Sequence, residues 1–349
     1  MRVALVGYGL AGRWFHRPLI AATAGLELTT VVTGDPERQA QARLDVPGAR
    51  VLDAPDRLWA LADEHELAVI ATPTASHVAL ASRAIAEGLP VVVEKPLAPG
   101  ASEAQALVEA ATAAGLALIP FHNRRWDSDH LTLRSLLARG ALGDVMRYES
   151  RFERWRPDAR PESWRETLPP QEGGGVLSDL GIHLVDQARD LFGPVRALYA
   201  EVEARRGGAD DDVFLALEHR SGVRSHLWAG ALSAAPGPRL RVLGSRAAYV
   251  HPGLDGQEAA LRAGAGPADP GFGEEPPARW GRLHHGDEAG EVVPGERGRW
   301  SDFYPGVLAA VRDGHAPPVR AQEAVAALAV LDAARRSAAE VTVVTPDDP

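Results

Sequence analysis

The sequence predicts a two-domain α/β protein. We expect a doubly wound parallel sheet first, then a C-terminal α+β domain with a large, mostly antiparallel open sheet. Strand-like and helix-like stretches alternate over residues 1–120, which favours a parallel sheet covered by helices. A glycine-rich turn directly follows the first apolar run. Beyond residue 145, strand-like segments follow one another with few helices between them, which favours antiparallel pairing. We therefore assign residues 1–121 and 122–349 to separate domains.

Apolar runs mark the buried strands expected in the first domain. They occupy residues 2–6, 26–33, 67–71, 90–94 and 116–120. Alanine-rich stretches between them predict helices at residues 36–44, 54–64, 76–87 and 102–114. Gly88 and Gly115 stand where helix-ending glycines are expected. Pro18 lies inside the first helical pattern and should limit the length of that helix.

The second domain shows a different pattern. A helix is predicted at residues 128–139, and a second helix ends near residue 191. Strand-like segments lie at residues 145–155, 195–205, 213–219, 223–228 and 239–243. Residues 252–299 are rich in Gly, Pro, Asp and Glu and have little periodicity, so we interpret them as a long excursion on the sheet. Helices near residues 305–313 and 321–339 should end the fold.

Composition narrows the class of protein. The chain has 349 residues, of which 45% are hydrophobic and 24% charged, as in globular proteins. A net charge of −10 disfavours nucleic acid and anionic membranes as partners. No apolar run approaches the roughly 18 residues of a spanning helix, and the N-terminus is interpreted as a strand rather than a signal peptide. Cysteine is absent, which excludes disulfides and thiolate chemistry and fits a cytoplasmic location.

The glycine-rich turn has the spacing and context of a dinucleotide-binding loop. It consists of Gly7, Tyr8, Gly9, Leu10, Ala11 and Gly12, between the first strand and a helix. Glycines at these positions allow a tight turn, close approach to a pyrophosphate and close helix–strand packing, with the helix N-terminus facing the anion. The pattern predicts a Rossmann domain that binds NAD or NADP. The alternative is a glycine-rich turn without a ligand.

The end of the second strand bears on the choice of cofactor. A carboxylate there would bind the ribose 2′-hydroxyl of NAD, but this sequence has Thr33 followed by Gly34. Asp35 is better placed to cap the next helix. Thr33, Gly34 and Arg38 could all contact a 2′-phosphate, so we favour NADP over NAD.

Polar residues follow two further strands of the first domain. Thr72 and Pro73, with His77 just beyond, follow the strand at 67–71, whereas Glu94 and Lys95 end the strand at 90–94. Carboxyl ends of parallel strands meet at one edge, where ligands bind. We expect these residues, Glu94 and Lys95 included, to contact the cofactor.

Lys95 is the only lysine among 37 basic residues. Abundant arginine fits a GC-rich genome, but codon bias does not explain why one lysine remains. Lysine is a compact charge with a tunable pKa, so this position is one where arginine does not suffice. The alternative is that Glu94 and Lys95 form a surface ion pair.

Asp179 and His183 follow a run of three glycines and are four residues apart, which places them on one face of a helix. Histidine is the usual general acid or base near neutral pH. Alternatively, Asp179 is only a first-turn carboxylate and His183 a satisfied core histidine. No third or fourth ligand at suitable spacing accompanies the pair, so we predict no metal site.

Together these motifs resemble the glucose–fructose oxidoreductase/inositol dehydrogenase family (Gfo/Idh/MocA). The segments that carry the resemblance are Gly7–Gly12, Ala71–Pro73 with His77, Glu94–Pro96, Asn123–Asp127 and Gly173–His183. Residues 121–129 and 253–258 are similar to the subgroup of NADP-dependent scyllo-inositol dehydrogenases. The resemblance implies that Lys95, Asp179 and His183 are catalytic and that the Lys95–Pro96 bond is cis. We expect substrate contacts from these three residues and from Asn123, Arg124 and Trp164.

The resemblance implies an NAD(P)-dependent dehydrogenase that exchanges a hydride with a carbinol carbon of a cyclitol or sugar. It also implies a homodimer or homotetramer formed through the sheet of the second domain. A non-catalytic dinucleotide or sugar sensor on the same fold is an alternative. Others are a glycosidase that uses bound NAD transiently and a reductase of keto-sugars.

Overall fold

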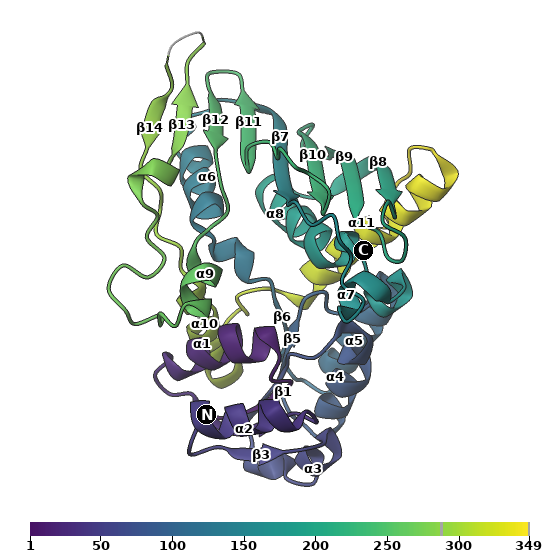
Figure 1. Ribbon diagram of the computed structural model, residues 1–349, viewed down its shortest axis with the longest axis vertical. Helices are drawn as coiled ribbons and strands as arrows, with labels where there is room; N and C mark the ends of the chain where they lie inside the picture. Colours follow the sequence, from purple (N-terminus) through teal and green to yellow (C-terminus); the bar gives the residue numbers. More distant parts are fainter. Residues whose placement is uncertain (287–288, 348–349) are drawn as a thin grey trace.

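The computed structural model describes residues 1–286 and 289–347 and has one sheet in each domain (Figure 1). The first sheet is parallel, in the order β3-β2-β1-β4-β5-β6. Its strands are β1 (Arg2–Val6), β2 (Glu27–Val32), β3 (Arg50–Leu52), β4 (Leu67–Ile70), β5 (Val91–Glu94) and β6 (Leu118–Phe121). This confirms the predicted doubly wound sheet. The sequence analysis missed β3, because three residues show too little periodicity to be recognised.

Helices cover both faces of the first sheet. They are α1 (Arg17–Ala21), α2 (Pro36–Asp45), α3 (Pro55–Trp59), α4 (His77–Ala86), α5 (Ala101–Ala113) and α10 (Phe303–Asp313). Alternate residues of β1 separate the two layers: Ala4 packs with α3, α4 and α5, whereas Leu5 packs with α1, α2 and α10. Pro18 lies in the first turn of α1, where proline is tolerated, after a π-helical turn at Gly12–His16. The predicted helix at 54–64 is instead the short α3 and a separate 3₁₀ turn.

Eight strands form the second sheet, in the order β14-β13-β12-β11-β7-β10-β9-β8. They are β7 (Val145–Glu153), β8 (Val195–Glu203), β9 (Asp212–His219), β10 (Arg224–Gly230), β11 (Leu240–Gly244), β12 (Ala248–His251), β13 (Gly281–His284) and β14 (Glu291–Val293). β7 and β10 are parallel and the other pairs antiparallel, which confirms the predicted type of sheet. Residues 252–299 are more regular than expected, because they contain β13, β14 and α9 (Gln257–Arg262).

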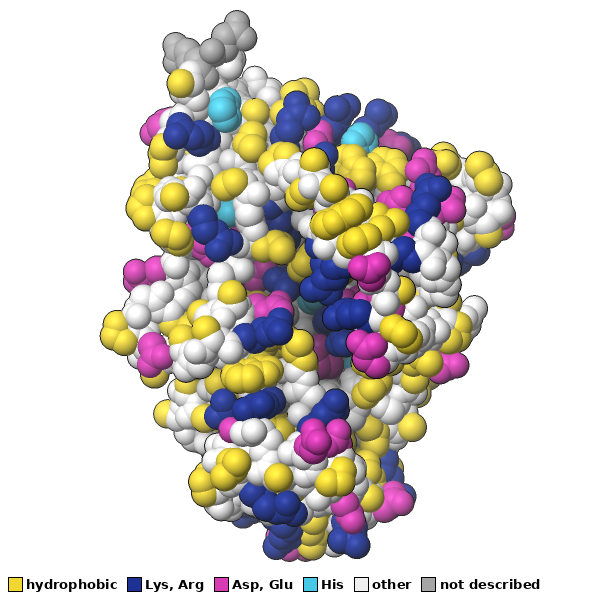
Figure 2. Space-filling model, in the orientation of Figure 1, with side chains coloured by type: hydrophobic (Ala, Val, Ile, Leu, Met, Phe, Trp, Pro, Cys, Tyr) yellow, Lys and Arg dark blue, Asp and Glu magenta, His cyan; other side chains and the backbone are white. Residues whose placement is uncertain are grey.

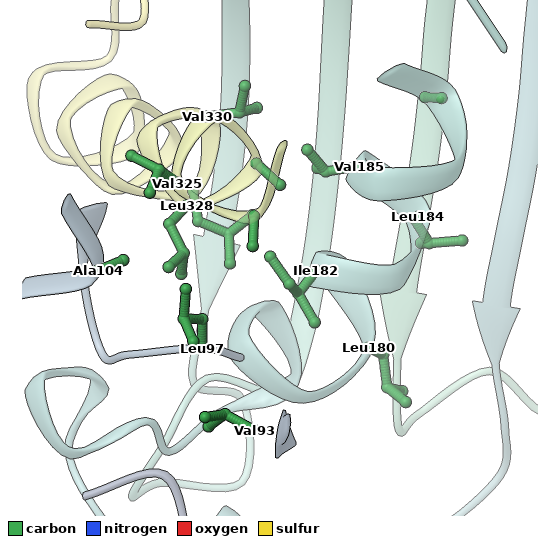
Figure 3. Packing of buried hydrophobic residues seen from close by; sticks show 14 of the residues in the cluster. Val93, Leu97, Ala104, Leu180, Ile182, Leu184, Val185, Val325, Leu328 and Val330 are labelled. Atoms are coloured by element: carbon green, nitrogen blue, oxygen red, sulfur yellow. The ribbon is translucent and has the colours of Figure 1, made fainter. Parts of the chain in front are cut away.

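One face of the second sheet is covered by α6 (Ser128–Ala138), α8 (Ile182–Phe192) and α11 (Ala321–Glu340). Figure 3 shows how the domains share this core: Leu97 and Ala104 of the first domain lie near Ile182 of α8 and Leu328 of α11. This packing holds the N-terminus of α8 beside the carboxyl end of β5. Among the described residues, no helix has the length and apolarity to cross a membrane.

Candidate active site

The glycine loop leaves room for a dinucleotide. Gly7 has φ +99°, and a Cβ there would lie 2.4 Å from the carbonyl oxygen of Ala71. A Cβ at Gly12 would lie 2.0 Å from the carbonyl oxygen of Gly7, so both positions need glycine. A Cβ at Gly9 would meet only Arg38 Nη1, at 3.5 Å. The loop is therefore tightly packed against the protein at Gly7 and Gly12, whereas the space beside Gly9 is open. This arrangement fits a pyrophosphate at the helix N-terminus.

The other residues of the loop contribute differently. Tyr8 is buried, and its hydroxyl donates to Asp45 Oδ2 at 2.9 Å. Its side chain is thus part of the packing, and only its backbone is available to a dinucleotide. Leu10 is 42% exposed and Ala11 is half-buried.

The end of β2 has the features expected from the sequence. The Asp35 carboxylate accepts hydrogen bonds from the backbone N–H groups of Glu37 and Arg38, at 2.9 and 3.1 Å, which confirms that it caps α2. The exposed Arg38 lies with its Nε 3.6 Å from Asp35 Oδ2. Thr33 is buried at the strand end, and Gly34 follows it on the surface. The one carboxylate next to Thr33 and Gly34 in the sequence, that of Asp35, is thus engaged with α2 and with Arg38.

His77 supports the two loops at the sheet edge. Its Nδ1 lies 2.8 Å from the carbonyl oxygen of Pro96 and its Nε2 lies 2.9 Å from that of Thr72. The ring is buried, and burial lowers its pKa. Both nitrogens contact the backbone, so the His77 ring links the loop at Thr72 to the loop at Pro96 and has no nitrogen left for another partner.

Glu94 belongs to a buried chain of contacts that the sequence analysis did not predict. Its Oε1 lies 3.2 Å from His16 Nε2, and His16 Nδ1 lies 2.6 Å from the Tyr304 hydroxyl. Glu94 Oε2 accepts the backbone N–H of Lys95 at 3.0 Å. Burial opposes ionisation, but the contact with His16 outweighs it and lowers the pKa of Glu94. His16 and Tyr304 thus hold an ionised carboxylate directly before Lys95.

Lys95 connects the two domains. Its peptide bond to Pro96 is cis, which confirms the expectation. Its Nζ donates to the backbone oxygen of Asp179 at 2.8 Å and to Oδ1 at 2.9 Å. The two side chains are 14% and 19% exposed. The alternative of a surface ion pair with Glu94 is therefore wrong, since the side chain of Lys95 pairs with Asp179 across the domain boundary.

Asp179 lies among three cations. Besides Lys95, Arg165 Nε donates to Oδ1 at 3.1 Å, and Arg154 Nη2 lies 3.7 Å from Oδ2. Burial would raise the pKa of Asp179, but Lys95 and then Arg165 outweigh it and hold the pKa well below its usual range. No hydrogen bond joins Asp179 to His183 in the described part of the chain, so this carboxylate orients Lys95 rather than the imidazole.

His183 is 4% exposed, in the first turn of α8, and stacks 6.4 Å from Phe152. Its Nδ1 is buried without a hydrogen-bond partner. Burial, and then the positive charge of Lys95, lower its pKa well below the usual value. The ring is therefore neutral at physiological pH. Its unpaired nitrogen does not fit the alternative of a satisfied core histidine.

Three consecutive glycines bring α8 into the site. A Cβ at Gly173 would lie 2.5 Å from the side chain of Thr74 in the first domain. A Cβ at Gly174 would lie 1.8 Å from the Leu168 carbonyl oxygen. The glycines permit this close approach of the two domains.

Asn123 and Arg124, which the sequence predicts as substrate residues, follow β6 in a 3₁₀ turn. Asn123 is buried. The Arg124 guanidinium lies 4.8 Å from the Phe152 ring and pairs with Asp127 at 3.2 Å and Glu258 at 2.9 Å.

Most of the chain matches one protein family. Residues 1–122 match the family model described as an oxidoreductase family with an NAD-binding Rossmann fold, and residues 134–345 match the C-terminal α/β domain of the same family. The chain belongs to the Gfo/Idh/MocA oxidoreductase family. This confirms the resemblance found in the motifs, and the enzyme is an oxidoreductase with an NAD(P)-binding domain.

Individual relatives cover nearly the full length of this Gfo/Idh/MocA chain. It is 34% identical to scyllo-inositol 2-dehydrogenase (NADP(+)) of Bacillus subtilis, over 97% of this chain and 94% of that protein. It is 39% identical to YdgJ, an oxidoreductase of Escherichia coli, over 97% and 96%. A solved structure of the oxidoreductase YvaA from Bacillus subtilis superposes with a TM-score of 0.91 at 31% identity, over 99% of both chains.

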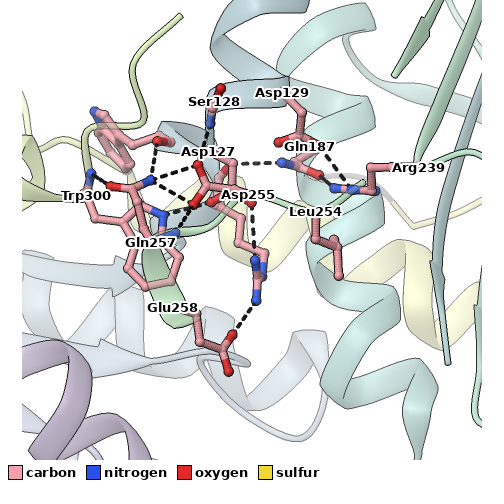
Figure 4. Close-up of polar contacts among 12 residues, drawn as sticks. Asp127, Ser128, Asp129, Gln187, Arg239, Leu254, Asp255, Gln257, Glu258 and Trp300 are labelled. Atoms are coloured by element: carbon pink, nitrogen blue, oxygen red, sulfur yellow. Dashed lines mark hydrogen bonds and ion pairs between the residues drawn. The ribbon is translucent and has the colours of Figure 1, made fainter. Parts of the chain in front are cut away.

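Figure 4 shows a polar network in this family member that contains Asp127, Asp255, Gln257 and Trp300. Asp127 accepts from Trp300 Nε1 at 2.7 Å, and the Trp300 backbone N–H donates to Gln257 at 2.9 Å. Asp255 accepts the Gln257 backbone N–H at 2.7 Å, and burial raises its pKa to about 6. The network joins the segments near residues 127, 255 and 300. It holds Asp127, the carboxylate that pairs with Arg124, in place.

The oxidoreductase has a hollow between its domains, with Lys and Arg side chains gathered beside it (Figure 2). Trp164 begins α7 (Trp164–Thr167), and the Arg165 guanidinium, which also contacts Asp179, lies 4.4 Å from its ring. Metal ligation has no support in the described residues, where no group of three or more His, Cys, Asp or Glu could hold an ion.

Proposed function

We propose that this oxidoreductase is an NADP-preferring dehydrogenase of a CH–OH group in a cyclitol or sugar. The observation that carries the proposal is the juxtaposition of a hydrogen-bonded Lys95 with a neutral, unpaired His183 at the carboxyl edge of the dinucleotide-binding sheet. The relative from Bacillus subtilis is named for NADP and scyllo-inositol, which supports the same cofactor and class of substrate here.

The side chains divide the chemistry between them. Bound NADP would accept the hydride from the substrate carbon. His183, being neutral, takes the hydroxyl proton, and the carbinol becomes a carbonyl. Lys95 donates a hydrogen bond to the reacting oxygen and stabilises the negative charge that develops on it. Asp179 holds the Lys95 ammonium in place.

The direct test is a substrate screen with both cofactors. Inositols, aldoses and their oxidised forms are incubated with NADP or NAD, and the absorbance of the reduced cofactor is followed. We expect turnover of polyols, faster with NADP. Tight dinucleotide binding without turnover of any compound would favour the sensor. Cofactor retained through purification together with cleavage of glycosides would favour the glycosidase. Reduction of ketones much faster than oxidation of alcohols would assign the reductase direction.

Thr33→Asp should reverse the cofactor preference. The new carboxylate would repel a 2′-phosphate and accept from the ribose hydroxyls of NAD. We expect the ratio of kcat/KM for NADP over NAD to fall by about tenfold or more, because a like-charge contact of about 1.4 kcal/mol already gives tenfold. Thr33→Ser is the neutral control. If the parent enzyme already prefers NAD, the interpretation of Thr33 and Gly34 is incorrect.

The outer face of the second sheet supports self-association. The ring centroid of Phe214 lies 5.2 Å from that of Trp228 and 5.9 Å from that of His226. The Arg151 guanidinium carbon lies 3.9 Å from the centroid of the Trp228 ring. Such an aromatic patch with charged neighbours is typical of interfaces. We propose that two copies of the chain pair through it. Trp228→Glu should weaken the dimer in sedimentation equilibrium. The same change at Leu44 of α2 in the first domain, which is 74% exposed, should not. A parent chain that sediments as a monomer at all concentrations would refute the proposal.

A further inference from the structure

Positive charge exceeds negative charge on the substrate side of the hollow. The single carboxylate of Asp179 faces Lys95 at 2.9 Å, Arg165 at 3.1 Å and Arg154 at 3.7 Å. In the described part of the chain, Asp179 is the one ion-pair partner of both arginines. The cluster formed by Lys95, Arg154, Arg165 and Asp179, which we call the Asp179 cluster, therefore holds three positive groups against one carboxylate. Outside the cluster, the ionised Glu94 acts on Lys95, and Glu258, which pairs with Arg124, acts on Arg154.

The environment of His183 independently indicates the same sign of potential. After burial, the strongest influences on its pKa come from the positive groups Lys95 and Arg124, which both lower it. Arg124 is matched by Asp127 and Glu258, so the excess resides in the Asp179 cluster. The buried Nδ1 of His183 has no hydrogen-bond partner among the described residues, so no carboxylate of the protein offsets the positive potential at this ring.

The excess charge is partly removed from water. The side chains of Arg154 and Arg165 are 30% and 37% exposed. Burial lowers the pKa of Arg154. The charge of Asp179 opposes this shift, and Arg156 and Arg160 add to it. Holding cations in such a place costs free energy unless an anion accompanies them. A guanidinium has the planar pair of donors that suits a carboxylate or a phosphate.

We infer that the preferred substrate is an anionic polyol, whose carboxylate or phosphate binds Arg154 and Arg165 while a hydroxyl lies between Lys95 and His183. This inference rests on the proposed function and narrows its class of substrate. The arginines come from the segment before α7 and from α7 itself. The pyrophosphate of the cofactor is expected instead at the glycine loop of the other domain.

The test compares each neutral compound with an anionic derivative that has a carboxylate or phosphate, with NADP held at saturation. Suitable pairs are D-glucose with D-glucuronate, D-glucitol with D-gluconate, and myo-inositol with an inositol monophosphate. We expect kcat/KM for the anion to exceed that for the neutral partner by about tenfold or more, as for one charge-assisted contact. This advantage should shrink with added salt. The carboxylate and phosphate pairs show which anion is preferred.

Variants of Arg154 and Arg165 test whether these two side chains cause the preference for anionic substrates. Arg154→Gln and Arg165→Gln should each raise KM for the anion by about tenfold and leave KM for the neutral partner nearly unchanged. Arg154→Lys should retain part of the parent enzyme's preference for the anion over the neutral partner. Arg220→Gln is the matched control, because that exposed arginine lies in the turn after β9 and makes no ion pair among the described residues. The melting temperature of each variant shows whether it is folded.

The possible outcomes separate the two proposals. Turnover of neutral polyols without preference for anions would overturn the inference and leave the proposed function intact. Absence of turnover with every compound would overturn both. Equal losses for anionic and neutral substrates in Arg154→Gln, or a weakened Kd for NADP in that variant, would assign the arginine to structure or to the cofactor and overturn the inference.

Discussion

Replacing Lys95 by arginine is expected to lower kcat by on the order of 10²-fold, the usual effect of losing one donor to a developing oxyanion. The charge is kept, but the geometry is not. Lys95 Nζ makes two contacts with Asp179, at 2.8 and 2.9 Å, from a side chain that is 14% exposed. A guanidinium is larger and its donors have fixed directions, so it cannot make these contacts and also reach the substrate oxygen.

The experiment measures kcat, KM and the Kd for NADP in the parent enzyme and in Lys95→Arg. Cofactor affinity should change little, because the lysine acts on the reacting oxygen. Arg83→Lys, at an exposed pair with Glu87, shows that exchange between these residue types is harmless elsewhere. A kcat close to that of the parent would show that Lys95 is not a catalytic residue. The presence of a single lysine among 37 basic residues would then have no functional explanation.

Parts of the site that depend on contiguous motifs could be predicted from the sequence. The glycine loop, the cap at Asp35 and the position of Lys95 all follow from local rules, because each motif lies at the end of a strand. The carboxyl ends of parallel strands meet at one edge, so the relative placement of Gly7 and Lys95 followed as well. The long helix α11 and the central strands were found because their patterns extend over many residues.

Contacts between distant segments could not be predicted. His16 lies 78 residues from Glu94 and 288 residues from Tyr304 in the sequence, and no periodicity connects them. Arg154 and Arg165 were overlooked because arginine is abundant throughout the chain, whereas the rarity of lysine singled out Lys95.

Elements with unusual composition were also missed. β13 and β14 have four and three residues and lie in a segment dominated by glycine, proline and acidic residues. Such strands form because a neighbouring strand offers its edge, and their own propensity contributes little. The partner of Asp179 likewise depends on tertiary contacts rather than on the local sequence. Helical spacing placed it on one face with His183, but tertiary packing brought Lys95 nearer.

His183→Asn should reduce kcat/KM for alcohol oxidation by on the order of 10²–10⁴-fold, as expected for loss of a general base. It should also abolish the acid limb of the pH profile. The imidazole accepts a proton only when neutral, so activity should fall as the pH drops through its pKa in the free enzyme. Because burial and Lys95 lower that pKa well below 6.5, the limb should lie on the acid side of pH 6.5. Parent-like activity in the variant would return His183 to a purely packing role.

Asp179→Asn provides the complementary result, because its carboxylate contacts Lys95 and not His183. We expect a reduced kcat with the acid limb of the pH profile unchanged. Combined with Lys95→Met, Asp179→Asn should add little to the loss, since residues that act as a unit are non-additive. Combined with His183→Asn, the losses should instead multiply, because the two side chains act on different events: placement of the ammonium and removal of the proton. Asp53→Asn, at an exposed pair with Arg57, controls for loss of a carboxylate. If the Asp179→Asn, His183→Asn double variant is no slower than the worse single one, the carboxylate acts through the imidazole during turnover. The Lys95 contact would then not be the one that matters for the reaction.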